Sequence, residues 1–180
     1  MRNSYGVNDG AKEFEFICAC CGKPQRGSPA YGYDKPMEYF DIPENERGDR
    51  VQYDTDTCVI DRDQHYIKCT LDIPIIGAAE PLCWGVWIKL SATAFESYRD
   101  GIGSDQSSFK EVGWLTCTLP GYNELDQGGS LINLEVDVVG NPAGLRPSAY
   151  LSERDHPLVR DQHNGISWAQ AKAYVSSMPH

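Results

Sequence analysis

Apolar and polar residues alternate along several stretches of this chain. Between positions 65 and 76, Ile67, Cys69, Leu71 and Ile73 fall on one side of an extended chain and Tyr66 on the other. A period of two is typical of a strand with one buried face. Similar patterns predict strands over 12–18, 51–60, 111–119 and 130–139, and the apolar and aromatic content of 82–90 predicts a central strand. The aspartates of 61–64 favour a turn that makes a hairpin of 51–76.

Two other stretches have the spacing of a helix. Residues 91–100 combine a capping box of Thr93 and Glu96 with aromatic residues three apart. Residues 167–178 have a second box, Ser167 with Gln170, and a stripe of Ala169, Ala173 and Tyr174 before Pro179. Residues 24–50 contain four prolines and several glycines, so we predict a loop with at most one helical turn there.

This order of elements predicts an α+β fold, with a mainly antiparallel sheet, a short inserted helix, a C-terminal helix and both helices on one face of the sheet. Residues 13–180 suit a single domain, preceded by a flexible N-terminal arm over 1–12. Trp84 and Trp87 are three apart in a predicted strand, so they should point to opposite faces, with at least one in the core. Gly85 between them allows a bulge or a close backbone approach.

The charge of the chain narrows the choice of partners. Its 26 acidic and 16 basic residues give a net charge of −10, which disfavours nucleic acid and anionic membranes and favours a basic protein partner. No apolar run approaches the ~20 residues that span a bilayer, and the N-terminus lacks the features of a signal peptide, so we expect a cytoplasmic protein. In that compartment seven cysteines are expected as thiols or metal ligands.

Several acidic residues are candidates for contact with such a partner. The candidates are Asp54, Asp56, Asp61 and Asp63 in the predicted hairpin, together with Asp155 and His156. The hairpin aspartates lack the spacing of an EF-hand loop, and the simpler alternative is a solvated hairpin end. For Asp155 and His156 the alternative is a turn whose direction Pro157 fixes.

The stretch "CACCG" at 18–22 suggests a metal site. Cys18 and Cys21 have the spacing of half a zinc knuckle, and Gly22 would relieve the tight turn. A redox pair is the weaker hypothesis, because Pro24 and a loop follow where such a pair usually opens a helix. Thiols in an ordinary turn are the third alternative.

Motifs spread over the chain resemble those of the bacterial domain-of-unknown-function family 2199. They are "CCGKPQRGSPAYGYDKP", "DTCVID", "YIKCTLDIPI", "WGVWIKLS", "GWLTCTLPGY", "GLRP" and "DHPLVRDQHNGIS", from about residue 16 to residue 175. The resemblance implies a site built from Cys18, Cys21 and Cys58 with a histidine, but Gln25 stands at the position of that histidine. A structural zinc would then need Cys20, His65, Cys69, His163 or a water as a further ligand.

Two hypotheses about function follow. The first is a non-enzymatic, acidic protein-binding module, in its most concrete form an immunity protein that neutralises a basic bacterial toxin domain. The second is a metal-dependent hydrolase or a zinc-stabilised regulatory protein that uses Cys18, Cys21, Cys58 and His156. A nucleophilic set of Cys117 or Cys58 with His156 and Asp155 is also conceivable, but seven cysteines and four histidines offer many such combinations.

Overall fold

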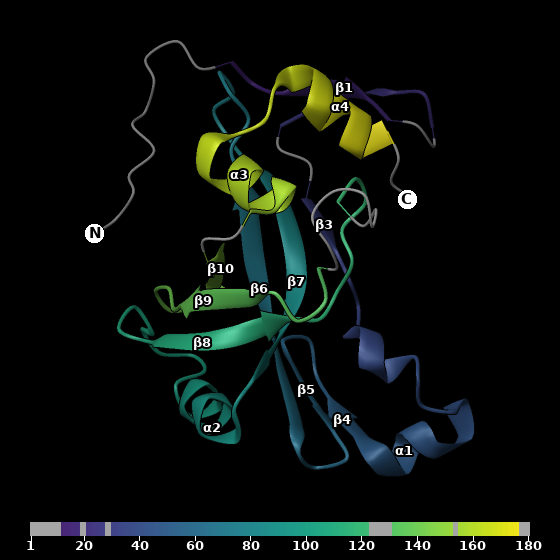
Figure 1. Ribbon diagram of the computed structural model, residues 1–180, viewed down its shortest axis with the longest axis vertical. Helices are drawn as coiled ribbons and strands as arrows, with labels where there is room; N and C mark the ends of the chain where they lie inside the picture. The colour runs from purple at the N-terminus through teal and green to yellow at the C-terminus, as the bar shows by residue number, and fades with distance from the viewer. Residues whose placement is uncertain (1–11, 19–20, 28–29, 123–130, 153–154, 177–180) are drawn as a thin grey trace.

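The computed structural model describes residues 12–18, 21–27, 30–122, 131–152 and 155–176, and Figure 1 shows the arrangement of their helices and strands. Most of the arm predicted over 1–12 lies outside these ranges, but Lys12 bridges to Ala78. The strands are β1 (Glu15–Ile17), β2 (Pro24–Arg26), β3 (Ala30–Gly32), β4 (Val51–Tyr53), β5 (Thr57–Ile60), β6 (Gln64–Ile73), β7 (Leu82–Leu90), β8 (Lys110–Leu115), β9 (Glu135–Val139) and β10 (Ser148–Leu151). The helices are α1 (Arg47–Arg50), α2 (Ala92–Asp100), α3 (Pro157–Asn164) and α4 (Trp168–Ser176), with 3-10 turns η1 (Met37–Tyr39) and η2 (Glu44–Glu46).

The antiparallel hairpin of β6 and β7 is the centre of the fold. Its register runs from His65 opposite Leu90 to Ile73 opposite Leu82. The predicted alternation is confirmed, because Ile67, Cys69, Leu71 and Ile73 enter the main core whereas Tyr66 enters a smaller second one. The turn that leads into β6 contains Asp61 and Arg62, both with positive φ, as in the type I′ turns that suit two-residue hairpins.

Five strands of the large sheet close into a small barrel. The pairings run β6–β7–β8–β9–β10 and return to β6, and β3, β5 and β4 extend the sheet beyond the ring. Most pairs are antiparallel, as predicted, but β10 meets β6 and β3 meets β7 in parallel. The structure is therefore α+β, with a mixed barrel in place of an open antiparallel sheet. Gly85 makes the predicted close approach, since a Cβ on it would lie 3.3 Å from Gly32 Cα.

The two faces of β7 bury side chains in different cores. Trp84 belongs to the main core inside and around the barrel, and Trp87 belongs to the second core with Ile42, Cys58 and Tyr66. The prediction that the two tryptophans point to opposite faces is thus confirmed. The indole N–H of Trp87 donates to the Tyr33 carbonyl at 2.9 Å, which ties the segment after β3 to this second core.

The helices lie at both ends of the β6–β7 hairpin, so the prediction of helices on one face of a sheet is wrong (Figure 1). α2 follows the end of β7, and its Phe95 stacks on His65 at the start of β6 with 5.0 Å between ring centroids. α3 and the segment after it lie at the other end, where the Ile166 N–H donates to the Pro74 carbonyl at 2.8 Å. Barrel closure causes this arrangement, because the open ends of the ring need covering.

The helix starts differ in part from prediction. The cap of α2 is Ser91, whose hydroxyl accepts from the Ala94 N–H, and not Thr93. The Ser167 and Gln170 box is confirmed, since each side chain bonds the backbone N–H of the other residue. The buried stripe of α4 is Ala171 with Val175, whereas the predicted Ala169 and Ala173 are exposed. None of the described helices is long and apolar enough to cross a membrane.

Candidate functional site

The cysteine turn joins β1 to β2 as a short hairpin. Cys18 is buried and Cys21 is exposed. The Gly22 N–H donates to the Cys18 carbonyl at 2.8 Å, and Gly22 has a φ of 66°, a conformation that glycine adopts without the steric cost of a Cβ. Cys20 lies outside the described residues. The described ends of this turn, with a buried thiol at Cys18 and an exposed one at Cys21, are thus held together by a backbone hydrogen bond.

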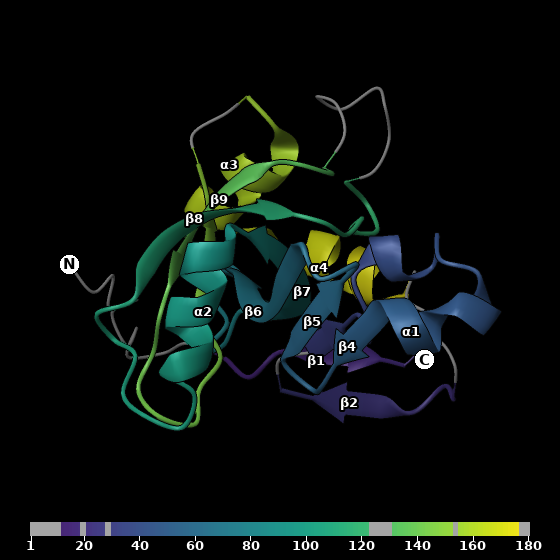
Figure 2. The same ribbon diagram turned by 90° about the horizontal axis from the view of Figure 1, so that it is seen from below.

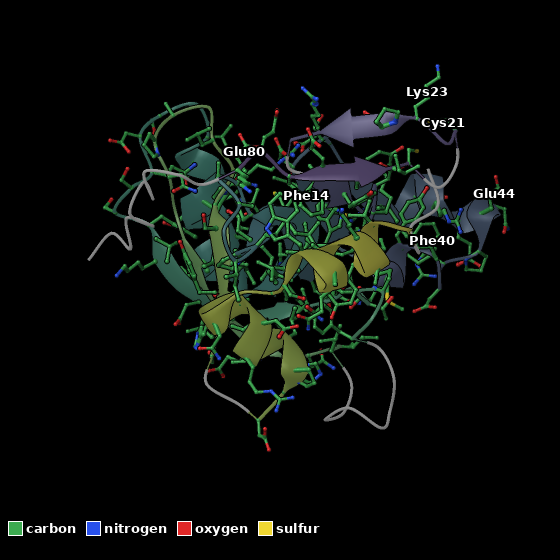
Figure 3. All side chains as sticks on the ribbon, turned by 90° about the horizontal axis from the view of Figure 1, so that it is seen from above. Phe14, Cys21, Lys23, Phe40, Glu44 and Glu80 are labelled. Atoms are coloured by element: carbon green, nitrogen blue, oxygen red, sulfur yellow. The ribbon has the colours of Figure 1, made fainter. Side chains whose placement is uncertain are left out.

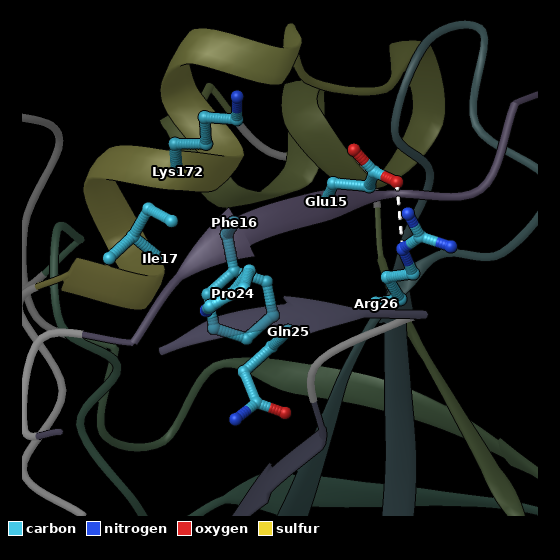
Figure 4. Close-up of a pocket in the computed structure, with 7 residues that line it drawn as sticks. All are labelled: Glu15, Phe16, Ile17, Pro24, Gln25, Arg26 and Lys172. Carbon is cyan, nitrogen blue, oxygen red and sulfur yellow. Dashed lines mark ion pairs between the residues drawn. The ribbon is translucent and has the colours of Figure 1, made fainter. Parts of the chain in front are cut away.

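Gln25 stands in β2, at the position of the missing histidine. It lies opposite Phe16 in the β1–β2 pairing and lines an open hollow of about 480 Å³ beside α4 (Figure 4). The ion pair between Arg26 and Glu15, 3.0 Å long, closes one end of the hairpin. Both side chains are largely exposed, so this pair contributes little to stability.

Cys58 lies elsewhere, in the second core under β5. Burial raises its pKa to about 11, so the thiol is neutral at physiological pH. Of the other proposed ligands, Cys69 is fully buried, His65 stacks on Phe95 and His163 is exposed in the last turn of α3. Across the described part of the chain, no three His, Cys, Asp or Glu side chains are grouped so that they could hold a metal ion. The described donors are therefore not gathered at one point, and a zinc site that includes Cys20 stays a prediction.

The hairpin aspartates mostly have partners within the chain. Asp54 accepts from the N–H groups of Asp56 and Thr57 and from the Thr57 hydroxyl. Partial burial alone would raise the pKa of Asp54, but these hydrogen bonds and the charge of Lys35 hold it below its usual value. Asp54 thus fixes the turn between β4 and β5, and it has this structural role whether or not a partner binds.

Two further aspartates are held by arginines. Asp61 receives two hydrogen bonds of 2.7 Å from Arg50, which lower its pKa. Asp56 accepts from Arg146 at 2.6 Å and so connects the hairpin to the segment before β10. Asp63 is exposed, and no ion pair involves it within the described ranges.

His156 and Asp155 lie at the start of α3, where the sequence suggested only a turn. His156 is 1% exposed, and its Nδ1 accepts from the Leu158 N–H at 3.1 Å as the N-cap, with Pro157 in the first turn. Asp155 is exposed. Burial also raises the pKa of Cys117 to about 12. A nucleophilic set of Cys117, His156 and Asp155 would need a reactive thiol and a ring nitrogen aimed at it, and these contacts favour neither.

A surface that the sequence did not single out lies on η1 and β4. We call Met37, Tyr39, Phe40 and Tyr53 the aromatic patch. Phe40 is 63% exposed and Tyr53 is 54% exposed. Tyr39 meets both rings edge to face, with centroids 5.2 Å from Phe40 and 6.1 Å from Tyr53. The patch is an ordered aromatic surface that the fold leaves in contact with water.

Cations hold the aromatic patch in place. Lys35 Nζ lies 3.4 Å from the centroid of Tyr53, and the Arg47 guanidinium lies 4.6 Å from that of Tyr39. Arg47 Nε also donates to the Ile42 carbonyl at 2.9 Å, which fixes the guanidinium. Such contacts are worth about 0.5–1 kcal/mol each at exposed sites.

Comparison with family models shows which protein family the chain belongs to. A family model described as an uncharacterized protein conserved in bacteria, DUF2199, matches residues 17–166. The chain belongs to this family. The resemblance seen in its motifs is therefore confirmed. No curated protein and no solved structure showed significant similarity.

The sequence alone could have indicated part of the aromatic patch. Residues 37–40 contain two aromatic residues and a methionine inside a segment rich in proline and charge, which is unusual for a plain loop. Tyr53 is thirteen positions further on, and only the fold brings it to Tyr39. Residues 37–40 could have been singled out from the sequence, but the contact between Tyr39 and Tyr53 could not have been predicted from it.

Proposed function

We propose that this chain is a non-enzymatic protein-binding module, and that the aromatic patch is the centre of its binding surface. The observation that carries the proposal is the exposure of Phe40 and Tyr53 beside an acidic segment. Aromatic residues and arginine are enriched at protein interfaces, and a few such side chains supply most of the binding energy. A rim of charge around them then sets the choice of partner.

The acidic segment is residues 41–63. It contains eight acidic and three basic residues, so its net charge is −5 against −10 for the whole chain. Figure 3 shows Glu44, from this segment, beside Phe40 at the same end of the molecule. Half of the net charge therefore lies next to the aromatic patch.

Part of this charge is balanced internally. Arg50 pairs with Asp61 and Glu46, and Arg146 pairs with Asp56. Five acidic residues of the segment have no ion pair within the described part of the chain: Asp41, Glu44, Asp49, Asp54 and Asp63. Uncompensated carboxylates around an apolar centre favour a basic partner and speed its association at low salt.

The finer form of the proposal is an immunity protein that occludes a basic bacterial toxin domain in the cytoplasm. Its support is the combination of acidic charge, an ordered aromatic surface and thiols whose pKa values are raised by burial, which makes them poor nucleophiles. Membership in a bacterial family is consistent with it.

Co-expression tests this form directly. A secreted toxin encoded beside the gene for this chain is expressed alone, with the wild-type chain, with Phe40→Ala and with the control Leu145→Ala, whose side chain is equally exposed on another loop. We expect the wild type and the control to restore growth, and Phe40→Ala to protect at least tenfold less, the effect of losing about 1.4 kcal/mol of binding. Unchanged killing in the presence of the wild type contradicts the immunity role.

A further inference from the structure

The outer face of β8, β9 and β10 carries a carboxylate that pairs with no other residue of the described ranges. Asp137 is in β9, the middle strand of the three. It lies opposite Val112 of β8 on one side and opposite Tyr150 of β10 on the other. Its neighbours along the strand, Val136 and Val138, are fully buried, so Asp137 points outward.

This position is unfavourable for an aspartate. Aspartate is depleted in strands, and cross-strand pairs stabilise a sheet when their side chains match in polarity. Val112 and Tyr150 offer no charge or donor directly across from the carboxylate except the tyrosine hydroxyl at the end of its ring. Among the contacts of the described residues, no ion pair or hydrogen bond involves the Asp137 side chain. A residue that breaks a local rule without compensation is typical of a functional site.

The surface around Asp137 is hollowed. The hollow has a volume of about 410 Å³, which lies in the lower range of ligand sites. Val112 and Tyr150, 44% and 46% exposed, form apolar walls on either side of the carboxylate. Lys110 and Glu111 of β8 also line the hollow, but Glu111 lies opposite the buried Val138, so of these two only Lys110 is on the outward face with Asp137. Glu135 lies one outward position from Asp137 along β9, so two carboxylates and one ammonium leave this face with a net negative charge.

We propose that this hollow binds an arginine side chain from an extended segment of a protein partner. The guanidinium would pair with the Asp137 carboxylate, the Tyr150 ring would lie against its face, and Val112 would contact its methylene groups. Arginine fits better than lysine because its planar fork bonds a carboxylate through two N–H groups and stacks on an aromatic ring, whereas a lysine ammonium is a compact, strongly hydrated charge.

The hollow is separate from the aromatic patch. Figures 1 and 2 both place β8 and β9 on a different side of the molecule from α1 and β4. This inference goes beyond the proposed function and does not depend on it. A partner could use the hollow alone.

An NMR titration of the full chain tests the inference. The probe is the blocked tripeptide acetyl-Gly-Arg-Gly-amide, compared with the same peptide carrying Lys or Gly in the centre. We expect saturable shifts of the backbone amides of Val112, Asp137 and Tyr150 with the arginine peptide, weaker binding of the lysine peptide and none of the glycine peptide. Asp137→Asn, which keeps the size of the side chain, should weaken arginine binding about tenfold, the effect of losing one charge-assisted pair.

Three control variants make the result specific. Glu13→Gln removes an exposed carboxylate beside β1, outside both the hollow and the acidic segment, and should leave binding unchanged. Tyr150→Phe keeps the ring and should bind within about twofold of wild type, whereas Tyr150→Leu should bind about threefold to tenfold more weakly. The spectrum of each variant without peptide shows whether it is folded. Absence of saturable shifts, or equal binding by the wild type and Asp137→Asn, overturns the inference. Neither result tests the proposed function, which depends on Phe40 and the aromatic patch.

Discussion

The side-chain carbonyl of Gln162 accepts a hydrogen bond of 2.8 Å from the backbone N–H of Leu151. The amide of the same side chain donates to the Ala149 carbonyl at 2.9 Å. β10 pairs with β6 only at Ser148 opposite Thr70, so beyond that point a side chain from α3 replaces the missing strand. Gln162 is 4% exposed and thereby closes the seam of the barrel.

Replacing Gln162 should therefore destabilise the whole fold. Gln162→Leu leaves a buried N–H and a buried carbonyl unpaired, at a cost of roughly 1–3 kcal/mol for each group, so we expect a loss of about 2–4 kcal/mol. Urea unfolding followed by circular dichroism measures it. Arg160→Gln, an exposed change on the same helix, should stay within about 0.5 kcal/mol of wild type. Equal stability of Gln162→Leu and the control would mean that the seam does not depend on this amide.

His156 gives a second test of the same region. His156→Ala removes the whole buried imidazole ring and with it the acceptor of the α3 N-cap, which should cost about 1–3 kcal/mol. His156→Asn restores an oxygen acceptor at the cap, so we expect a smaller loss in the same unfolding measurement. If the two variants are equally unstable, the packing of the ring matters and the cap does not.

The fold could be predicted from sequence where local pattern decides it. The strand 82–90 was predicted with its observed bounds, because a short run this rich in apolar and aromatic residues is typical of a central strand. The predicted strand 51–60 is two strands, since Asp54 turns the chain between β4 and β5. That capping bond is local, and an Asp–x–Asp–Thr sequence could have suggested it.

Closure of the barrel could not be predicted in this way. β10 has only four residues, and the pairing that closes the ring joins its Ser148 to Thr70 of β6, which is distant in sequence. α3 was missed for a different reason. Pro157 was interpreted as part of a turn, although proline is common in the first turn of a helix and His156 before it has an acceptor nitrogen.

The candidate site was less predictable than the fold. The charges of Asp56 and Asp61 were visible in the sequence, but their pairing with Arg146 and Arg50 depends on register and turn geometry. Asp137 was visible only as an alternating residue of a strand. Its exposure between Val112 and Tyr150 follows from the order of three strands, which no local pattern fixes.

Cysteine reactivity should follow burial. Burial raises the pKa of Cys58 to about 11 and that of Cys117 to about 12, so at pH 8 about one Cys58 thiol in a thousand is ionised in the folded protein. Cys21 is exposed. Iodoacetamide at pH 8 should modify Cys21 at least about a hundredfold faster than Cys58, as peptide mass spectrometry can measure. Labelling in urea is the control, where the two rates should converge. Rapid labelling of Cys58 in the native protein would contradict its placement in the second core.

Glu38 should make stability depend on pH. Burial raises its pKa above the ordinary 4.5, although a backbone hydrogen bond and the charge of Lys89 oppose this. Its Oε2 is buried and has no hydrogen-bond partner among the described residues. The folded state thus holds this proton more tightly than the unfolded state, so ionisation of Glu38 removes stability as pH rises through and above 4.5.

Glu38→Gln should accordingly be more stable than wild type at pH 7, and the difference should shrink towards pH 4, where Glu38 is protonated. Unfolding midpoints in urea across pH 4–7 test this. Glu44→Gln, on an exposed 3-10 turn, is the control and should show no such trend. If the stability advantage of Glu38→Gln over the wild type grew as pH falls, it would contradict a raised pKa of Glu38 in the folded state.

The most direct test of the central claim is photocrosslinking in the native bacterium. p-Benzoyl-phenylalanine replaces Phe40 in one strain and Leu145 in another, two side chains that are 63% and 66% exposed. We expect a discrete crosslink to a basic protein from position 40 alone, lost when Tyr53→Ala is added. No crosslink from position 40, or the same products from both positions, would contradict the claim that the aromatic patch binds a protein partner.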